Sequence, residues 1–411
     1  MAESNLLKIE QTNKYDKLLI IFIVLQIFGI LGGALQPIRL FVIIFTPFLL
    51  ASLFKDQYLM KNYGYELIAF GLWIIYGLIS ILWVLEPSES IKDVFYLLVN
   101  FIGFFLFILF ASKAKCPKES IIKAWLILFI LTIPIAIIEL RFNKHLPSTF
   151  HSDPILFNIG RGIFMERRFA SVTYGNLNGY NTILVYILPF IVGNNITTKS
   201  SSFTIRVINW LLVVILSYII IANSSRSAFL CLLICLFIFL CFYVKNIKRA
   251  ILTGFLFTVT VVIFLSINKE FIDAIFIRIQ EQGLEDKARG QLIHNGIDLL
   301  LESSFMGIGA GNFMPFMLQK YKLSLIAPHN LFLEVIVQYG IIIFGLFIGI
   351  IIRIIRSNMG NKNKKYNFIV IASLIIYPLS SIINSGYILN ISTWLLLSSL
   401  YVISDKKYDV R

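Results

Sequence analysis

Long apolar runs recur along almost the whole chain, and short polar segments separate them. A helix of about 20 apolar residues is long enough to cross a hydrocarbon core roughly 30 Å thick. The predicted fold is therefore an all-α, polytopic transmembrane helical bundle of about 12 spans. The runs cover residues 18–35, 37–54, 65–85, 92–112, 121–140, 180–193, 206–222, 226–244, 250–267, 329–352, 367–383 and 388–403.

Two of the intervening segments are much longer than a turn, at residues 141–179 and 268–328. Loops held on a rigid scaffold are where binding and catalytic residues concentrate. The other segments are too short to fold by themselves. We therefore predict a single membrane domain over residues 1–411, with functional residues in the two long loops.

The composition agrees with this pattern. Of the 411 residues, 58% are hydrophobic and 14% are charged, and the mean hydropathy is +0.84. An ordinary soluble domain contains about 25% charged residues, so this class is excluded. Three of the four cysteines lie in the run 226–244 and the fourth is Cys116, which favours core packing over a disulfide framework or a metal site.

The distribution of charge predicts the orientation. Cytoplasmic loops are enriched in Lys and Arg. With the N-terminus inside, 22 of the 36 basic residues and 8 acidic residues fall on the cytoplasmic side, and 14 basic and 13 acidic residues fall outside. Both termini are then cytoplasmic and both long loops lie outside. The net charge of +14 reflects this orientation, so it gives no reason to expect nucleic acid as a partner.

The longer loop contains a helical pattern followed by a glycine-rich segment. Four polar residues share one face of the predicted helix, and apolar residues occupy other faces, so we expect an amphipathic helix near the membrane surface. The polar residues are Gln291, Asn295, Asp298 and Glu302, and the apolar ones are Leu292, Gly296, Leu299 and Leu300. His294 is expected in the solvated or interfacial part.

The glycine segment reads Gly307-Ile-Gly309-Ala-Gly311-Asn312. A dinucleotide site is excluded because no strand precedes the segment and the third glycine comes one residue early. Two interpretations remain open. The segment is either a flexible re-entrant turn or a backbone surface that closes on a ligand.

A polar stripe begins at Pro328-His329-Asn330. Asn330, Glu334 and Gln338 recur every four residues on an otherwise apolar helix, so they are expected to face the bundle interior or a wet cavity. Glu334 is either a satisfied structural carboxyl or a functional one. At a helix N-terminus His329 is kept neutral, and a neutral imidazole can accept a proton from a sugar hydroxyl, although most histidines at this position are caps or interface residues.

Arginines stand on the predicted outer side, where the charge rule disfavours them. Arg226 follows Asn223-Ser-Ser, and Arg167, Arg168 and Arg289 are in the outer loops. Arginine binds phosphate oxygens bidentately and stays charged, which suits a pyrophosphate at a membrane surface. The alternative is contact with lipid headgroups or snorkelling of the side chain to the membrane surface, which we expect for Arg39, Arg161 and Arg278.

Three stretches resemble the O-antigen polymerase and ligase superfamily of bacterial membrane glycosyltransferases. They are RRFASVTYGNLNGYNTILVYILPF (167–190), NSSRSAFL (223–230), and the block from Ala288-Arg-Gly through GIGAGNFMPF to PHNLFLEVIVQYGIIIFG. The resemblance covers about residues 160–350. The sequence departs from the family pattern at Ser303-Ser304-Phe305-Met306, where a segment containing proline is more usual.

The resemblance implies a metal-independent, inverting glycosyltransferase of the bacterial inner (cytoplasmic) membrane that needs no cofactor. Such enzymes transfer glycan from undecaprenyl pyrophosphate to an acceptor hydroxyl on the periplasmic side. The implied partners are this lipid-linked donor, a glycan or lipid A-core acceptor, membrane lipids and a chain-length regulator protein.

The resemblance also implies site residues. The expected catalytic residues are His329 as base or hydroxyl-orienting group, Arg226 and Arg289 as charge stabilisers, and Glu334 as an orienting group. The expected substrate-binding residues are Arg168, Arg167, Asn330, Gly309, Gly311 and Asn312.

The identity of the acceptor separates two functions. The loop 141–179 mixes aromatic and asparagine residues, as expected for sugar binding, and the outer side is nearly neutral, which is unfavourable for a multiply phosphorylated acceptor. We therefore expect a polymerase of lipid-linked repeat units, with an O-antigen ligase as the alternative. A flippase or transporter is a third possibility, but such proteins more often contain internal repeats.

Overall fold

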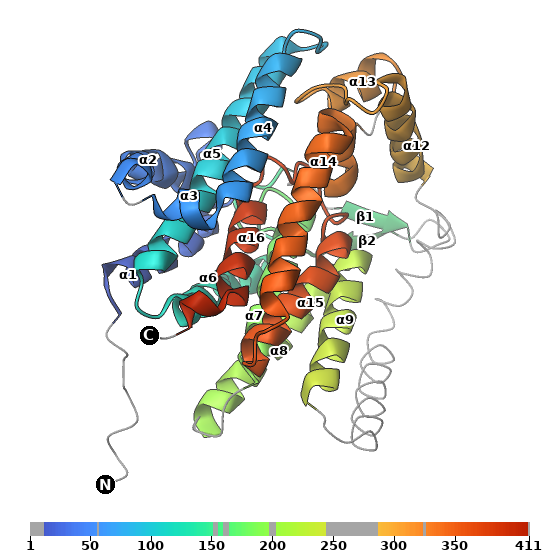
Figure 1. Ribbon diagram of the computed structural model, residues 1–411. Helices are drawn as coiled ribbons and strands as arrows, with labels where there is room; N and C mark the ends of the chain where they lie inside the picture. The colour runs from blue at the N-terminus through green and yellow to red at the C-terminus, as the bar shows by residue number, and fades with distance from the viewer. Residues whose placement is uncertain are drawn as a thin grey trace.

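The computed structural model describes residues 12–55, 57–150, 155–158, 164–196, 203–243, 287–323 and 326–409. Long helices pack side by side into one bundle (Figure 1). The helices are α1 Lys14–Val24, α2 Pro37–Lys55, α3 Tyr58–Asn62, α4 Gly64–Ser80, α5 Pro87–Lys113, α6 Pro117–Phe142, α7 Leu177–Gly193, α8 Phe203–Ala222, α9 Arg226–Tyr243, α12 Lys287–Glu302, α13 Phe313–Gln319, α14 Leu331–Asn358, α15 Lys364–Ser380 and α16 Ile391–Ser404.

The prediction of an all-α membrane bundle is confirmed. Within the described residues, five helices are long and apolar enough to span a membrane, and four shorter helices are also apolar. The predicted span 250–267 lies outside the described residues, so the count of about 12 stays a prediction. The loop 141–179 adds a small antiparallel hairpin of β1 (Ile155–Asn158) and β2 (Phe164–Arg167), which was not predicted.

The first predicted span, 18–35, is not one helix. α1 ends at Val24, and two short 3₁₀ turns follow at Leu25–Phe28 and Gly33–Leu35. Gly29, Gly32 and Gly33 all have positive φ, and a Cβ on Gly29 would lie 2.1 Å from the carbonyl oxygen of Thr173. The glycines therefore end the helix and let the segment that contains Thr173 pack against the turn.

Aromatic side chains hold α4, α5, α14 and α16 together in the middle of the bundle. The rings of Phe70 and Phe101 stack with centroids 4.0 Å apart. Trp73 lies edge-on to Tyr339 at 5.3 Å and to Trp394 at 5.8 Å. Such pairs add to the free energy gained by burying the rings, and they fix the position of α14 relative to its neighbours.

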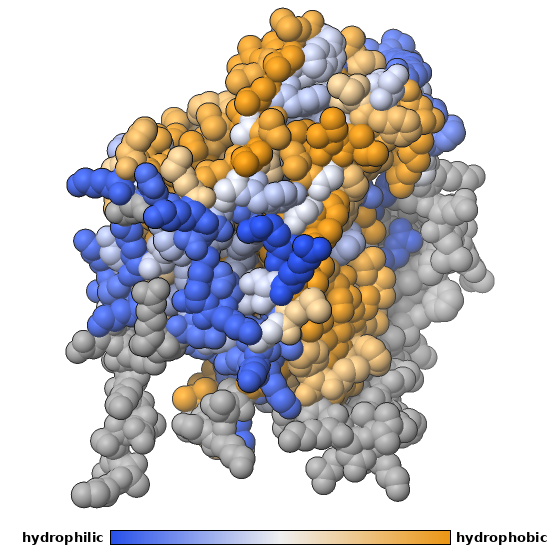
Figure 2. Space-filling model, in the orientation of Figure 1, coloured by the Kyte–Doolittle hydropathy of each residue, from blue (hydrophilic) through white to orange (hydrophobic). Residues whose placement is uncertain are grey.

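The bundle has two different ends. We call the end with the α4–α5 turn, residues 303–330 and the connection 381–390 the loop-rich end. The other, the lysine-rich end, carries residues 113–117, the connection 359–363 and the 3₁₀ turn Lys406–Tyr408. Figure 2 shows hydrophilic side chains gathered at the lower left and an apolar surface over much of the remaining face, as expected for a multi-pass membrane protein.

Candidate active site

The first half of α14 is separated from the second half by a backbone break at Gly340, where φ is 76° and ψ is 176°. The glycine segment lies against this break. The N–H groups of Ile308 and Gly309 donate to the carbonyls of Val337 and Gln338, both at 2.9 Å. In the other direction, the Ile341 N–H donates to the carbonyl of Phe305 at 3.0 Å. These bonds satisfy backbone groups that lipid cannot.

The close approach explains why glycines are needed. Gly307 has φ of 94°, and a Cβ there would lie only 2.5 Å from the backbone nitrogen of Gly340. The Asn312 amide holds the glycine segment in place. It accepts from the Leu85 N–H at 3.0 Å and donates to the Ile308 carbonyl at 2.7 Å. The structure thus shows a re-entrant turn whose polar groups at Gly309 and Asn312 are engaged within the protein.

A cavity of about 460 Å³ opens beside this turn. It lies between the start of α5, α13, the first half of α14 and the connection 381–390. We call it the acidic cavity, because four carboxyl groups and one lysine line it; its charged and amide side chains are Glu86, Glu89, Lys92, Asp93, Gln319, Glu334 and Gln338. Gly311 lines it as well, whereas Gly309 does not.

The predicted polar stripe does face this interior. Glu334 and Gln338 are buried and line the acidic cavity, as expected. Asn330 has a different position, because its side-chain oxygen accepts from the N–H groups of Phe332 at 3.0 Å and Leu333 at 3.2 Å. Asn330 is therefore the N-cap of α14, which fixes where the helix begins.

Glu334 is only 5% exposed. Its carboxyl faces the backbone N–H groups of Tyr387 and Ile388 and lies near Asp93. Its Oε2 atom has no hydrogen-bond partner among the described residues. Leaving a buried carboxylate oxygen without a donor costs free energy, so this oxygen is poised for a group that enters the cavity.

The connection 381–390 is held rigidly at the wall of the cavity. Asn100 donates to the Ile388 carbonyl at 3.1 Å, and the Trp394 indole donates to the same oxygen at 2.8 Å. The Tyr387 hydroxyl donates to the Ser380 carbonyl at 2.6 Å. Burial raises the pKa of Tyr387, so this hydroxyl stays protonated and remains a donor.

Arg289 approaches the same connection from another direction. Its Nη1 donates to the Ile382 carbonyl at 3.1 Å, which places the start of α12 at the end of α15. α12 also has the predicted amphipathic form, since Leu292, Gly296, Leu299 and Leu300 face inward while the His294 side chain is 78% exposed.

Arg226 is the first residue of α9 and is exposed. α9 and α15 run antiparallel, because Cys231 contacts Ile376 while Phe239 and Phe368 pack together further along. The start of α9 is therefore beside the end of α15 at the loop-rich end (Figure 1).

Arg168 lies close to this point in the fold. Asn223 accepts from the Ala170 N–H at 2.7 Å and donates to the Ala170 carbonyl at 3.1 Å, which ties the segment after β2 to the α8–α9 turn. Arg167 is the last residue of β2. We call Arg168, Arg226 and Arg289 the arginine group, since three distant stretches bring them to one end of the bundle.

His329 lies next to the acidic cavity, directly before the start of α14. It follows Pro328, which lines the acidic cavity, and precedes the N-cap Asn330. Its backbone φ is 43°, a left-handed conformation that is uncommon outside glycine, and the residue is half-buried. The predicted position at the start of a helix is confirmed, while its catalytic role stays a prediction.

The expectation for Arg39 was wrong. Instead of reaching lipid headgroups, Arg39 is buried, donates to the Gly33 carbonyl at 3.2 Å and to the Leu389 carbonyl at 3.5 Å, and lies 3.9 Å from the centre of the Tyr96 ring. The broken first span provides carbonyl groups that the guanidinium satisfies. Arg161 and Arg278 lie outside the described residues.

Sequence reasoning missed two parts of the site. The first is Asp93, for which the signal is an acidic residue in the first turns of an apolar span. The second is the connection 381–390, for which the signal is Asn384-Ser-Gly386 and Asn390 between two apolar runs. Its importance arises from its contacts with α5, α12 and α14, which are distant in the sequence.

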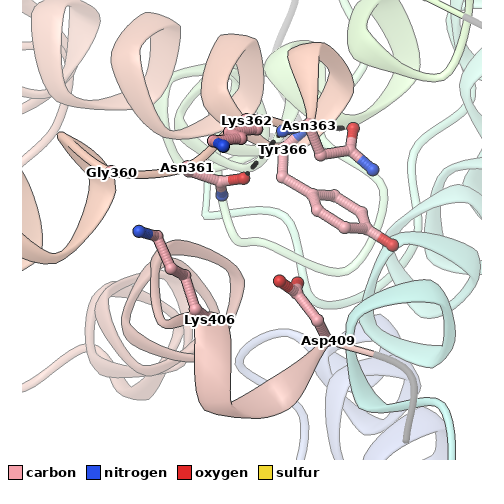
Figure 3. A pocket seen from close by; sticks show the side chains of 7 residues that line it. All are labelled: Gly360, Asn361, Lys362, Asn363, Tyr366, Lys406 and Asp409. Atoms are coloured by element: carbon pink, nitrogen blue, oxygen red, sulfur yellow. Dashed lines mark hydrogen bonds between the residues drawn. The ribbon is translucent and has the colours of Figure 1, made fainter.

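A second cavity, also of about 460 Å³, lies at the lysine-rich end (Figure 3). Gly360, Asn361, Lys362, Asn363, Tyr366, Lys406 and Asp409 line it. Asp409 is paired with Lys118 at 2.6 Å. None of the predicted site residues lies in this cavity, so the loop-rich end is the better candidate.

Residues 211–348 match the family model described as O-antigen ligase. The resemblance to the O-antigen polymerase and ligase superfamily is confirmed. The matched region contains Arg226, Arg289, His329 and Glu334, together with the glycine segment and the break in α14. The match covers about a third of the chain, so over these residues the chain is similar to the O-antigen ligase family, and its apolar helices are those expected of a multi-pass membrane protein.

The chain is also similar to the teichuronic acid biosynthesis protein TuaE of Bacillus subtilis (strain 168). The two are 24% identical over 339 residues, which cover 77% of this chain and 66% of the relative. The similarity thus spans a little under two thirds of the relative's length and extends well beyond the family match.

Proposed function

We propose that this protein polymerises undecaprenyl-pyrophosphate-linked oligosaccharide repeat units into a surface polysaccharide. The observation that carries the proposal is the arrangement around the connection 381–390. Arg289 of the arginine group is bonded to this connection at Ile382, the acidic cavity is lined by the same connection at Ser385, Gly386 and Leu389, and His329 follows Pro328 of the cavity lining. A glycosyl transfer between two lipid-linked glycans requires such a pair of neighbouring sites.

In the proposed reaction, an acceptor hydroxyl attacks the anomeric carbon of the donor from the face opposite the pyrophosphate. A new C–O bond forms, the bond from the anomeric carbon to the pyrophosphate oxygen breaks, and the configuration inverts. His329 accepts the hydroxyl proton or orients the hydroxyl, while Arg226 and Arg289 stabilise the charge on the departing pyrophosphate. Glu334 orients the acceptor.

The mechanism needs no metal ion, because fixed guanidinium groups can supply the charge stabilisation. Arg168 and Arg167 would assist in binding the pyrophosphate. The exposed side chain of Arg226 is consistent with contact to a ligand that arrives from the membrane surface. A chain-length regulator protein and membrane lipids would be further partners.

The proposal places the loop-rich end in the periplasm and both termini in the cytoplasm of a bacterial inner membrane. A membrane-impermeant maleimide should then label Phe150→Cys in intact cells, and Lys362→Cys only after permeabilisation. Cys241, which is exposed, should first be replaced by serine. A cysteine at residue 285, outside the described residues, should behave like one at 150. Cytoplasmic labelling at 150 would overturn the orientation.

The alternative function is that of an O-antigen ligase, which transfers the glycan to lipid A-core. The description of the matching family favours it. The acidic cavity favours polymerisation, because four carboxylates and one lysine at its lining would repel a phosphorylated acceptor. The relative that acts in teichuronic acid biosynthesis is consistent with a polysaccharide product.

Deletion of the gene tests the choice. A strain without a polymerase should display single repeat units on its surface carrier. A strain without a ligase should instead accumulate full-length polymer on undecaprenyl pyrophosphate, and this result would refute polymerisation as the function.

A further inference from the structure

The lining of the acidic cavity contains both polar and apolar groups. Its polar groups come mostly from α5 and the first half of α14, which contribute Glu89, Asp93 and Glu334. α13 and the segment after it contribute mainly apolar groups, including Phe313, Met314 and Ile326, together with the amide of Gln319, which donates to Glu86 at 3.0 Å. A lining that combines polar and apolar groups matches a sugar ring, which has hydroxyl edges and a C–H face.

The size and charge of the cavity narrow the class of ligand. Its volume of about 460 Å³ is within the range of roughly 300 to 1,000 Å³ for small-molecule sites. The described carboxylates do not gather in a set of three that would hold a metal ion. A lipid tail would leave the buried Glu334 and Gln338 without partners, so a polyol fits better than either.

The buried Glu334 is evidence for a ligand that does not depend on the volume or charge of the cavity. Its Oε2 lacks a hydrogen-bond partner among the described residues, whereas the neighbouring Ile388 carbonyl accepts from the Asn100 amide at 3.1 Å. A sugar hydroxyl is a donor of the right size for this oxygen. An acidic sugar would bring a further acidic group into a cavity that four carboxyl groups and one lysine already line, which is unfavourable at low dielectric constant.

We infer that the acidic cavity binds a sugar residue of the acceptor glycan that carries no acidic group, with Glu334 accepting a hydrogen bond from one of its hydroxyls. The inference rests on the proposed function, since it assigns the acceptor to this cavity and leaves the donor pyrophosphate to the arginine group. The cavity then determines which repeat unit is extended.

A protection experiment tests this without requiring turnover. Ser385 lines the cavity, so Ser385→Cys can be labelled with a small maleimide in the full-length protein in nanodiscs after Cys241→Ser. The probe is the repeat-unit oligosaccharide released from its lipid. One portion is carboxyl-reduced, which makes every sugar neutral, and a second portion is oxidised at its primary hydroxyls, which makes the sugars acidic.

The neutral oligosaccharide should slow labelling, and the acidic one should need at least about tenfold higher concentration for the same protection. Glu334→Gln, which keeps the shape of the side chain, should weaken protection by the neutral form about tenfold or more. Glu89→Gln, at the mouth of the cavity, should bring the concentrations of the neutral and acidic oligosaccharides needed for equal protection closer together. Glu302→Gln on α12, outside the cavity, is the matched control and should change neither value.

Equal protection by both oligosaccharides, or protection by neither, would overturn the inference. Undiminished protection in a well-folded Glu334→Gln variant would do the same. These outcomes are separate from failure of the proposed function, which is judged by the glycans of the deletion strain. A ligase phenotype with clear protection would leave a sugar site in a protein of the other function.

Discussion

Two buried carboxylates at opposite ends of the bundle differ in how they are bonded. At the lysine-rich end, Asp16 accepts hydrogen bonds from the N–H groups of Asn13, Lys115 and Cys116 and from the Ser120 hydroxyl, at 2.9 to 3.1 Å. At the loop-rich end, Glu334 is nearly as buried, yet its Oε2 has no partner among the described residues and faces a cavity.

The difference separates a carboxylate that holds the fold from one that is available to a ligand. Asp16 joins the start of α1 to the α5–α6 turn, so its cost of burial is offset within the protein. Glu334 is fixed by the packing of α14, and part of its cost of burial is not offset. Substitutions at the two ends should therefore affect different measurements.

The largest effect is expected for Asp16→Asn. An amide keeps the shape but offers one acceptor atom in place of two, so donors to one oxygen lose their partner. We expect a loss of about 3 kcal/mol in the free energy of unfolding, since hydrogen bonds to charged groups contribute about 1.5 to 3 kcal/mol each. Thermal unfolding in detergent measures it, and glycan transfer per folded molecule should be unchanged.

At the loop-rich end, Arg226→Ala, Arg289→Ala and His329→Ala should each reduce glycan transfer at least about a hundredfold, because each removes a charge stabiliser or a base. The protein should still insert and fold. The Lys variants at 226 and 289 should rescue poorly if the arginines bind phosphate bidentately. Transfer is measured with lipid-linked repeat units.

Arg206→Ala is a matched control for Arg226→Ala, since Arg206 is also an exposed arginine near the start of a helix. It should leave transfer unchanged. Near-normal transfer by a well-expressed His329→Ala variant would remove His329 from the catalytic assignment.

The contrast between the two ends also shows what the sequence reveals. Apolar periodicity predicted the positions of most helices, the buried face of α12 and the stripe that contains Glu334, because each depends on neighbours within one helix. The pairing of the glycine segment with the break in α14 was not predicted. Gly340 stands in a continuous apolar run, and only contacts with residues some thirty positions earlier reveal the break.

Contacts between residues that are distant in the sequence also explain the other features that were not predicted. Asp16 is bonded to residues about a hundred positions away. The importance of Ile382 depends on Arg289, which is 93 positions away, and that of Leu389 depends on Arg39, which is 350 positions away. Patterns within a segment cannot contain such information.

Gly340→Ala should lower both the free energy of unfolding and the rate of glycan transfer, to an intermediate extent. A Cβ at this position would lie 2.2 Å from the Met306 carbonyl oxygen, and φ is 76°. We expect a loss of about 2 kcal/mol in stability, since forced left-handed backbone costs about 1 to 3 kcal/mol, and lower transfer because the acidic cavity shifts. Gly345→Ala is the control, because nothing lies within 4 Å of a Cβ there.

The smallest change in stability is expected for Glu334→Gln, and its sign distinguishes the two carboxylates. The substitution replaces a buried carboxyl by a neutral amide of the same shape, and the amide oxygen can still face the N–H groups of Tyr387 and Ile388. Its melting temperature should equal or exceed that of the unsubstituted protein, with a difference of less than about 1 kcal/mol in unfolding free energy. A loss as large as that of Asp16→Asn would mean that Glu334 holds the fold, and the distinction between the two ends would be wrong. If the variant is as stable as the unsubstituted protein but binds the acceptor more weakly, Glu334 contributes to acceptor binding and not to folding.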